Sequence, residues 1–121
     1  MANFALLKQN IVIAVIVIDN EVITNNGVEV EQLGIDFIDS LNIPYDYDTA
    51  RQTSYNSNTR NKYAGIGDTW DETNNVFISP RPFSDWTLNE NFKWEAPIPY
   101  PNDNKSYVWV NNEWKEFNFN N

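Results

Sequence analysis

Residues 63–101 read YAGIGDTWDETNNVFISPRPFSDWTLNENFKWEAPIPYP, and this stretch decides the fold expected for the chain. Within it, Trp70 and Phe77 flank one polar run, and Trp86 and Trp94 flank a second. Aromatic residues at strand ends around a turn rich in Asn, Asp and Glu are typical of β-hairpins. The stretch therefore predicts hairpins held apart by proline-rich extended segments.

The same pattern recurs beyond this stretch, where Trp109 and Trp114 flank Val110 to Glu113. Asn favours turns because its side chain bonds its own backbone and because it tolerates a positive φ. Working outward, we expect hairpin turns at Asp71–Asn75, Asn89–Asn91 and Asn111–Glu113. No helix longer than one turn is expected after Tyr63.

Length and charge limit the classes of protein that the chain can belong to. With 121 residues it is one domain, or one compact domain with a small appendage. It has 8 basic and 17 acidic residues, a net charge of −9. Binding to nucleic acid or to an anionic membrane needs clustered Lys and Arg, so neither partner is expected.

The chain contains no Cys and no His. Their absence removes thiol catalysis, disulfides, the usual structural zinc sites, the commonest general base and any Ser-His-Asp triad. No cofactor and no metal are expected.

The N-terminal part begins with a predicted strand, Phe4 to Leu7, a turn at Lys8–Asn10 and a second strand, Ile11 to Ile18. The second strand is a continuous apolar run, IVIAVIVI, which fits a strand buried on both faces. It is too short for a transmembrane helix, which needs about 20 apolar residues. A signal peptide is disfavoured because only Lys8 precedes the run and no cleavage site follows it.

One amphipathic helix is predicted from Val30 to Leu41, where apolar residues recur at helical spacing. We expect it to lie on the sheet that the first hairpin begins. The fold class is therefore mainly β with a minor α part. A shift in composition at Tyr63 suggests two parts, 1–62 and 63–121, which could still pack as a single domain.

Several carboxylates occur close together in the sequence. The groups are Asp46 with Asp48, Asp68 with Asp71 and Glu72, and Asp85 with Glu90. Glycosidases use two carboxylates with aromatic platforms, but this spacing is not specific for one. A calcium loop needs alternating oxygen ligands with a Gly and a closing Glu, which the chain lacks. We therefore expect no enzymatic activity.

The aromatic residues allow two interpretations. They can form the core across hairpins, or they can line a groove for a sugar or an extended chain. The candidate interface residues are Trp70, Phe77, Phe83, Trp86, Trp94, Tyr100, Trp109 and Trp114.

The motifs YAGIG-x-T-W-D, FI-x-P-x-PF-x-x-W-T-L-N-E and WEAP-x-PYP, followed by K-x-Y-x-W, resemble a module of small proteins from tailed phages of cyanobacteria and other marine bacteria. These proteins are described as virion structural or tail-fibre-related proteins. The resemblance spans Tyr63 to Trp114 and extends to Gln52–Asn56 and to Asn3-Phe4-Ala5. Two departures are Ser84-Asp85, where the family has Pro-Ser, and Asn102–Asn104, where it has a turn ending in Gly.

The resemblance implies a structural component of a virion, placed at the tail, the baseplate or fibre junction, or on the capsid as a decoration protein. Its partners would be other virion proteins or copies of itself. The alternative is a module at a fibre tip that binds a carbohydrate or receptor. The apolar run and the aromatic residues predict that neighbouring chains cover part of the surface.

Overall fold

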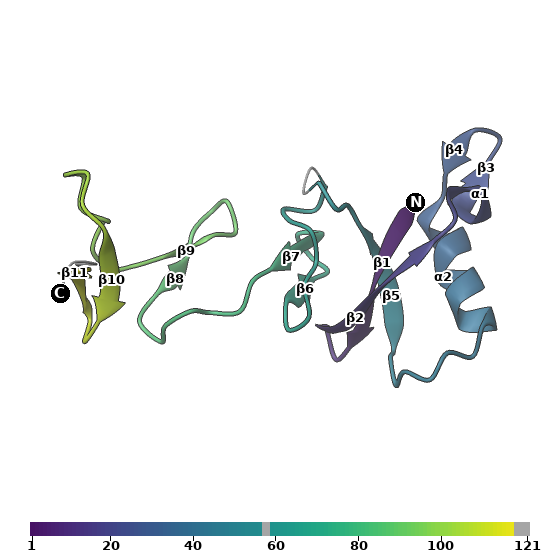
Figure 1. Ribbon diagram of the computed structural model, residues 1–121. Helices are drawn as coiled ribbons and strands as arrows, with labels where there is room; N and C mark the ends of the chain where they lie inside the picture. The colour runs from purple at the N-terminus through teal and green to yellow at the C-terminus, as the bar shows by residue number, and fades with distance from the viewer. Residues whose placement is uncertain (57–58, 118–121) are drawn as a thin grey trace. The chain divides into compact units, whose positions relative to one another are not determined.

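The computed structural model describes residues 1–56 and 59–117, which form two compact units, Met1–Pro80 and Arg81–Asn121. Strands joined in antiparallel pairs dominate both units, so the prediction of a mainly β fold with a minor α part is confirmed (Figure 1). The boundary lies at Pro80, later than the Tyr63 suggested by composition. The hairpin after Tyr63 belongs to the first unit because it pairs with the N-terminal sheet.

The first unit is built on a five-stranded sheet in the order β5-β1-β2-β6-β7. Its strands are β1 (Ala2–Lys8), β2 (Ile11–Ile18), β5 (Thr49–Thr53), β6 (Thr69–Asp71) and β7 (Val76–Ile78). The predicted turn between β1 and β2 is confirmed. It is closed by Gln9 and Asn10, whose φ angles are 50° and 66°. Two consecutive positive φ angles are typical of two-residue hairpin turns, because their twist matches that of the flanking strands.

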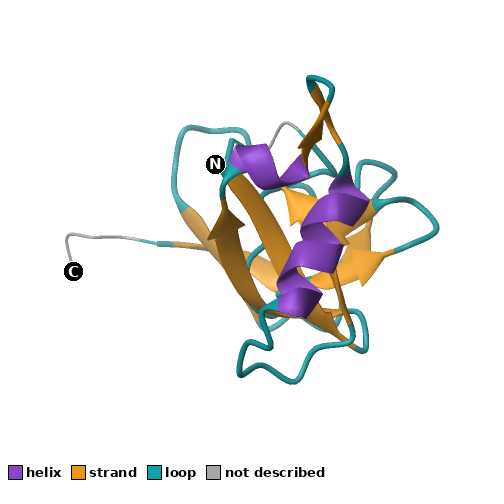
Figure 2. Cartoon of the chain, turned by 90° about the vertical axis from the view of Figure 1, so that its right-hand side faces the viewer, coloured by secondary structure: helices purple, strands orange, loops and turns teal. Residues whose placement is uncertain are grey.

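One face of this sheet is covered by α2 (Glu31–Ser40), as Figure 2 shows. The helix agrees with the predicted span, because Val30 and Leu41 are its capping residues. It packs with Ile35 and Ile38 onto a core that contains Phe4. Gly34 permits the close approach, since a Cβ there would lie 2.2 Å from Cζ of Phe4.

A second core cluster, separate from the one under α2, includes side chains of the β6–β7 hairpin. Trp70 and Phe77 pack there with Leu7 and Val12. Strand β2 thus contributes buried side chains to both clusters, as the apolar run predicts. The hairpin reaches only the first residues of β2, however, and Val17 at its other end is 52 % exposed.

A short helix, α1 (Asn20–Ile23), and a small hairpin, β3 (Thr24–Asn25) with β4 (Val28–Glu29), connect β2 to α2. The helix begins because the Asp19 side chain accepts a hydrogen bond from the backbone N–H of Glu21. Ile23 at its end is fully buried in the core under α2.

The second unit contains two hairpins, β8 (Thr87–Leu88) with β9 (Trp94–Glu95) and β10 (Tyr107–Val110) with β11 (Glu113–Glu116). The three turns predicted after Tyr63 are confirmed, since none of them lies inside a continuous strand. Asn111 and Asn112 close the last one with φ angles of 52° and 66°. No helix occurs between residues 63 and 117.

Candidate functional site

The second unit is built around a cluster of aromatic rings. The Trp86 ring lies 5.9 Å from Trp109 and 5.9 Å from Trp114, in edge-to-face orientations. Tyr100 contacts Trp114 at 4.9 Å between centroids, and Phe83 contacts Trp86 at 5.4 Å. Tilted and edge-to-face pairs are favourable because the positive edge of one ring meets the negative face of another. The cluster therefore takes the place of an aliphatic core in this unit.

Hydrogen bonds fix the rings in this arrangement. The indole N–H of Trp114 donates to the carbonyl of Ile98 at 2.7 Å, which joins the proline-rich segment to β11. The indole N–H of Trp109 donates to Asp85 at 3.3 Å. The Tyr107 hydroxyl donates to Asp103 at 2.6 Å, and this bond raises the pKa of Tyr107 to about 12.

A groove of about 550 Å³ is open beside this cluster. Its walls are Trp86, Trp94, Tyr100, Trp114 and the segment from Glu95 to Pro99. Pro97 and Pro99 restrict the backbone of one wall before any partner binds. The indole N–H of Trp86 is buried and has no hydrogen-bond partner among residues 1–56 and 59–117. Arg81 lies over the outer wall, 5.0 Å from the ring of Trp94.

The structure divides the eight candidate interface residues between the two units. Four of them, Trp86, Trp94, Tyr100 and Trp114, line the groove. Two more, Phe83 and Trp109, pack against Trp86 without lining the groove; Phe83 is exposed and Trp109 is buried.

Trp70 and Phe77, the remaining two, are 3 % and 0 % exposed in the core of the first unit. Their side chains therefore present almost no surface to a partner. The structure thus places the candidate residues in two settings: Trp70 and Phe77 in a buried core, and the four groove residues around an open hollow.

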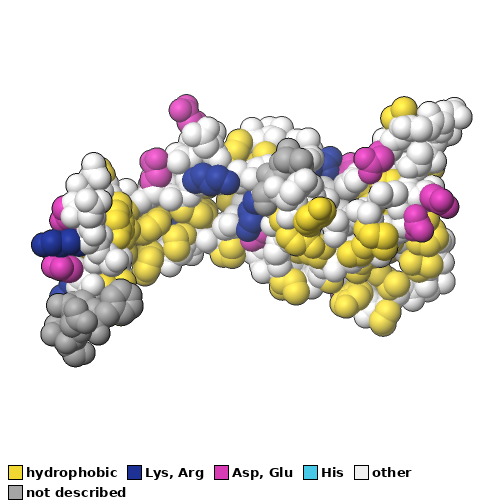
Figure 3. Space-filling view, turned by 45° about the horizontal axis from the view of Figure 1, so that its top comes forward, with side chains coloured by type: hydrophobic (Ala, Val, Ile, Leu, Met, Phe, Trp, Pro, Cys, Tyr) yellow, Lys and Arg dark blue, Asp and Glu magenta, His cyan; other side chains and the backbone are white. Residues whose placement is uncertain are grey.

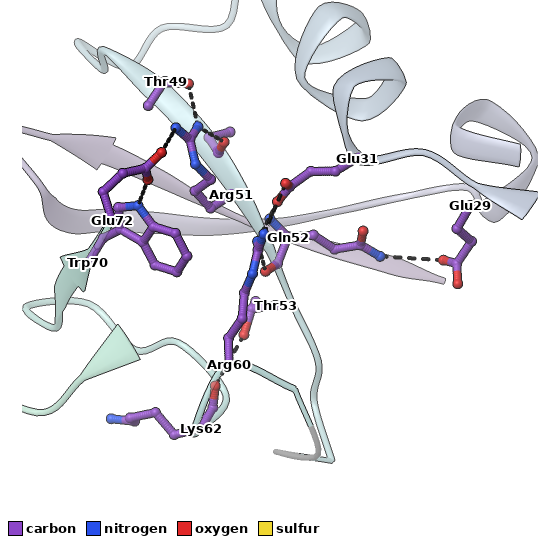
Figure 4. Close-up of polar contacts among 11 residues, drawn as sticks. Glu29, Glu31, Thr49, Arg51, Gln52, Thr53, Arg60, Lys62, Trp70 and Glu72 are labelled. Carbon is purple, nitrogen blue, oxygen red and sulfur yellow. Dashed lines mark hydrogen bonds and ion pairs between the residues drawn. The ribbon is translucent and has the colours of Figure 1, made fainter. Parts of the chain in front are cut away.

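The first unit holds a charged network that the sequence did not suggest (Figure 4). Both guanidinium nitrogens of Arg60 bond the carboxylate of Glu31, and one of them also donates to the backbone carbonyl of Gln52 at 3.0 Å. Glu31 in turn accepts the backbone N–H of Gln52 at 2.6 Å. The pair of Arg60 and Glu31 thus bonds both the backbone N–H and the backbone C=O of Gln52 on β5.

A polar hollow of about 740 Å³ borders this network, where β1 begins and β5 ends. Asn3, Thr53 and Tyr55 contribute to its lining together with Glu31 and Arg60. Glu31 and Arg60 form an ion pair with each other, so their opposite charges are neutralised within the lining of the hollow. It has the character of a solvated indentation at the end of the sheet.

Hydrogen-bond donors lower the pKa of several carboxylates. The pKa of Glu31 is lowered because the bonds from Arg60 and Gln52 outweigh the effect of burial. The backbone N–H of Gln9 lowers the pKa of Asp48, and the indole of Trp70 lowers that of Glu72. A catalytic general acid needs the opposite shift. Within the described ranges, no group of three or more acidic residues is placed to hold a metal ion.

Comparison of the chain with protein-family models, with curated proteins and with solved structures finds no match. In the part of the chain that the structure describes, neither helix has the length and apolar character needed to cross a membrane.

Proposed function

We propose that this chain is a structural component of a tailed-phage particle and acts through protein–protein contacts. The particle is suggested by the sequence motifs between Tyr63 and Trp114. The mode of action is supported by one observation above all: the second unit leaves seven large apolar residues exposed, two of which, Ile98 and Tyr100, line its aromatic groove. The seven residues are Phe83, Leu88, Ile98, Tyr100, Val108, Val110 and Phe117.

Chemistry and shape of the groove suit an extended protein segment. Trp and Tyr are favoured anchors in protein interfaces because they contribute large contact areas with few rotatable bonds. The prolines of one wall reduce the entropy that the groove loses on binding. Figure 3 shows hydrophobic side chains at the surface of both units, so either unit offers surface to neighbours.

The proposal is tested on phage particles that carry the gene, purified by density gradient. We expect the chain to sediment with infectious particles at a fixed copy number, measured by quantitative mass spectrometry. Replacing Trp94 by Ala should lower its incorporation, because it removes a groove wall. Tyr45→Ala, at an exposed tyrosine of the first unit, is the matched control. A chain recovered only in the soluble fraction of infected cells would refute the proposal.

Glycan binding at a fibre tip is the second candidate function. It is favoured by Trp86, Trp94 and Tyr100 in one groove, together with the Glu95 carboxylate. Sugar rings stack on aromatic faces while their hydroxyls bond such polar groups. Saturable quenching of tryptophan fluorescence by a host surface glycan, abolished by Trp94→Ala, would favour this function over the first.

A further inference from the structure

The outer edges of the five-stranded sheet are both capped by residues 60–61. On β5, the side chains of Arg60 and Glu31 bond the C=O and N–H of Gln52, as Figure 4 shows. On β7, the N–H of Phe77 donates to the carbonyl of Arg60 at 3.1 Å, and Asn61 donates to the carbonyl of Phe77 at 2.8 Å. Capped edges resist pairing with other chains.

Strand β2, by contrast, has an edge that is open along most of its length. It pairs with β6 only where Ile11 lies opposite Thr69. The next residue, Val12, forms backbone hydrogen bonds with Gly67 and Asp68, which precede β6. From Ile13 to Ile18, the described part of the chain places no strand and no hydrogen-bond partner on this side. The open edge faces away from β1.

The register shows which backbone groups this edge presents. Residues of an antiparallel strand alternately face one neighbour and the other. Val12 faces away from β1, because its N–H donates to Asp68 at 2.9 Å and its C=O accepts from Gly67 at 2.8 Å. A bulge then adds Ile13, and Ala14 pairs with Leu6 of β1. The alternation therefore directs the N–H and C=O of residues 15 and 17 outward.

The side chains at this edge are uncharged and apolar. The sequence from Ile13 to Ile18 is IAVIVI, without Lys, Pro or any other residue that protects natural edges. Val17 is 52 % exposed, and Ile13, Val15 and Ile16 are half-buried. A six-residue edge with five β-branched residues is a strong template for another strand.

We infer that this edge binds the same edge of a second copy of the chain, antiparallel and about a two-fold axis at Ile16. This register places Val15 of each copy opposite Val17 of the other. Because all four residues face outward, they exchange four backbone hydrogen bonds and leave no outward N–H or C=O unpaired. The inference deepens the proposed function, because it rests on the premise that the chain acts through protein–protein contacts.

A two-fold axis at Ile16 aligns the open segments of the two copies with each other. On each copy the open segment starts after Val12, which is occupied by the 67–68 segment, and ends at Ile18, before Asp19 begins α1. In the two-fold register Ala14 lies opposite Ile18, and Ile16 lies opposite itself. No charged residue lies opposite another, which matters for a chain of net charge −9.

The contact is small, so we expect reversible association. Two paired edge strands bury less than the roughly 1,200 Å² of a stable standard interface. In a particle with many copies, the linked contacts would reinforce one another through a high effective concentration.

Sedimentation equilibrium of the full chain tests the inference. We expect a monomer–dimer equilibrium whose dissociation constant rises at least about tenfold in Val17→Lys, because a charge at the edge must be placed against Val15 of the other copy. Val28→Lys, at an exposed valine of β4, is the matched control and should associate like the wild type. Circular dichroism verifies that each variant is folded.

Oxidative cross-linking provides a second measurement that does not depend on charge. The chain has no Cys, so Ile16→Cys adds one thiol at the expected axis, and it should form an intermolecular disulfide, whereas Val28→Cys should not. A wild-type chain that stays monomeric without cross-linking, or one whose association survives Val17→Lys, would overturn the inference. If the chain is monomeric but present in particles, the inference fails and the proposed function stands. If the chain dimerises through this edge but is absent from particles, the edge contact stands and the proposed function fails.

Discussion

Replacing Arg60 by Met removes the guanidinium that caps β5 while keeping an apolar stem of similar length. The variant loses two bonds to Glu31 and one to the carbonyl of Gln52, and it leaves the Glu31 carboxylate with the backbone N–H of Gln52 but without its cationic partner. The two side chains are 16 % and 28 % exposed, so solvent replaces the lost bonds only in part. Hydrogen bonds to charged groups contribute about 1.5–3 kcal/mol, and we expect a loss of about 2–3 kcal/mol.

Urea unfolding followed by the helical signal in far-ultraviolet circular dichroism measures this loss, because α1 and α2 both belong to the first unit. For a unit of this size the loss corresponds to a fall in melting temperature of about 10–20 °C. Arg51→Met is the control. Arg51 also lies over Trp70, but its partner Glu72 is 65 % exposed, so the expected loss is at most about 1 kcal/mol. Equal losses in the two variants would refute the reasoning.

Three further predictions concern packing, pH dependence and the second unit. Gly34→Ala should destabilise the chain by about 1–3 kcal/mol although Ala favours helices, because its Cβ would overlap Phe4; a more stable variant in urea unfolding would contradict this. The pKa of Glu31 is lower in the folded state than its unfolded value near 4.5, so Glu31 stabilises the folded state at pH values above 4.5. This stabilisation is lost as the pH falls through the folded pKa. The free energy of unfolding of Glu31→Gln should therefore depend less on acid pH, measured by the same urea unfolding. Absorbance titration should find one tyrosine, Tyr107, with a pKa of about 12, and Asp103→Asn should return it towards 10; an unchanged titration would show that the bond does not form.

The local features of the fold could be predicted from the sequence because each has a local cause. The helix follows from apolar spacing between Val30 and Leu41, and the turn at Gln9 and Asn10 follows from residues that tolerate a positive φ. The run from Ile11 to Ile18 also identified a strand that contributes to the core, since its short length and β-branched residues favour a strand over a helix.

Long-range pairing explains what the sequence could not show. Trp70 and Phe77 belong to the same aromatic-rich stretch as Trp86 and Trp94, and composition does not separate the two pairs. Only the pairing of Ile11 with Thr69 assigns the first pair to the N-terminal core. This is also the reason why the boundary lies at Pro80 and not at Tyr63.

The edge-capping residues gave no signal either. Arg60 lies in a polar loop with a φ of 55°, and Glu31 lies in the first turn of a helix, where an acid is expected on the helix dipole alone. Their contact with Gln52 depends on how the loop and the helix meet at the sheet edge. The open edge of β2 is equally invisible in the sequence, which shows an apolar strand but not which of its sides is paired.

Amide hydrogen exchange at single-residue resolution, measured over a range of concentrations, tests most directly the claim that β2 is a contact edge. The amides of Ala14 and Ile16 face β1 and should exchange slowly at every concentration. The amides of Val15 and Val17 should exchange fast in dilute solution and become protected together as the concentration rises. Exchange at these two amides that is independent of concentration would contradict the account.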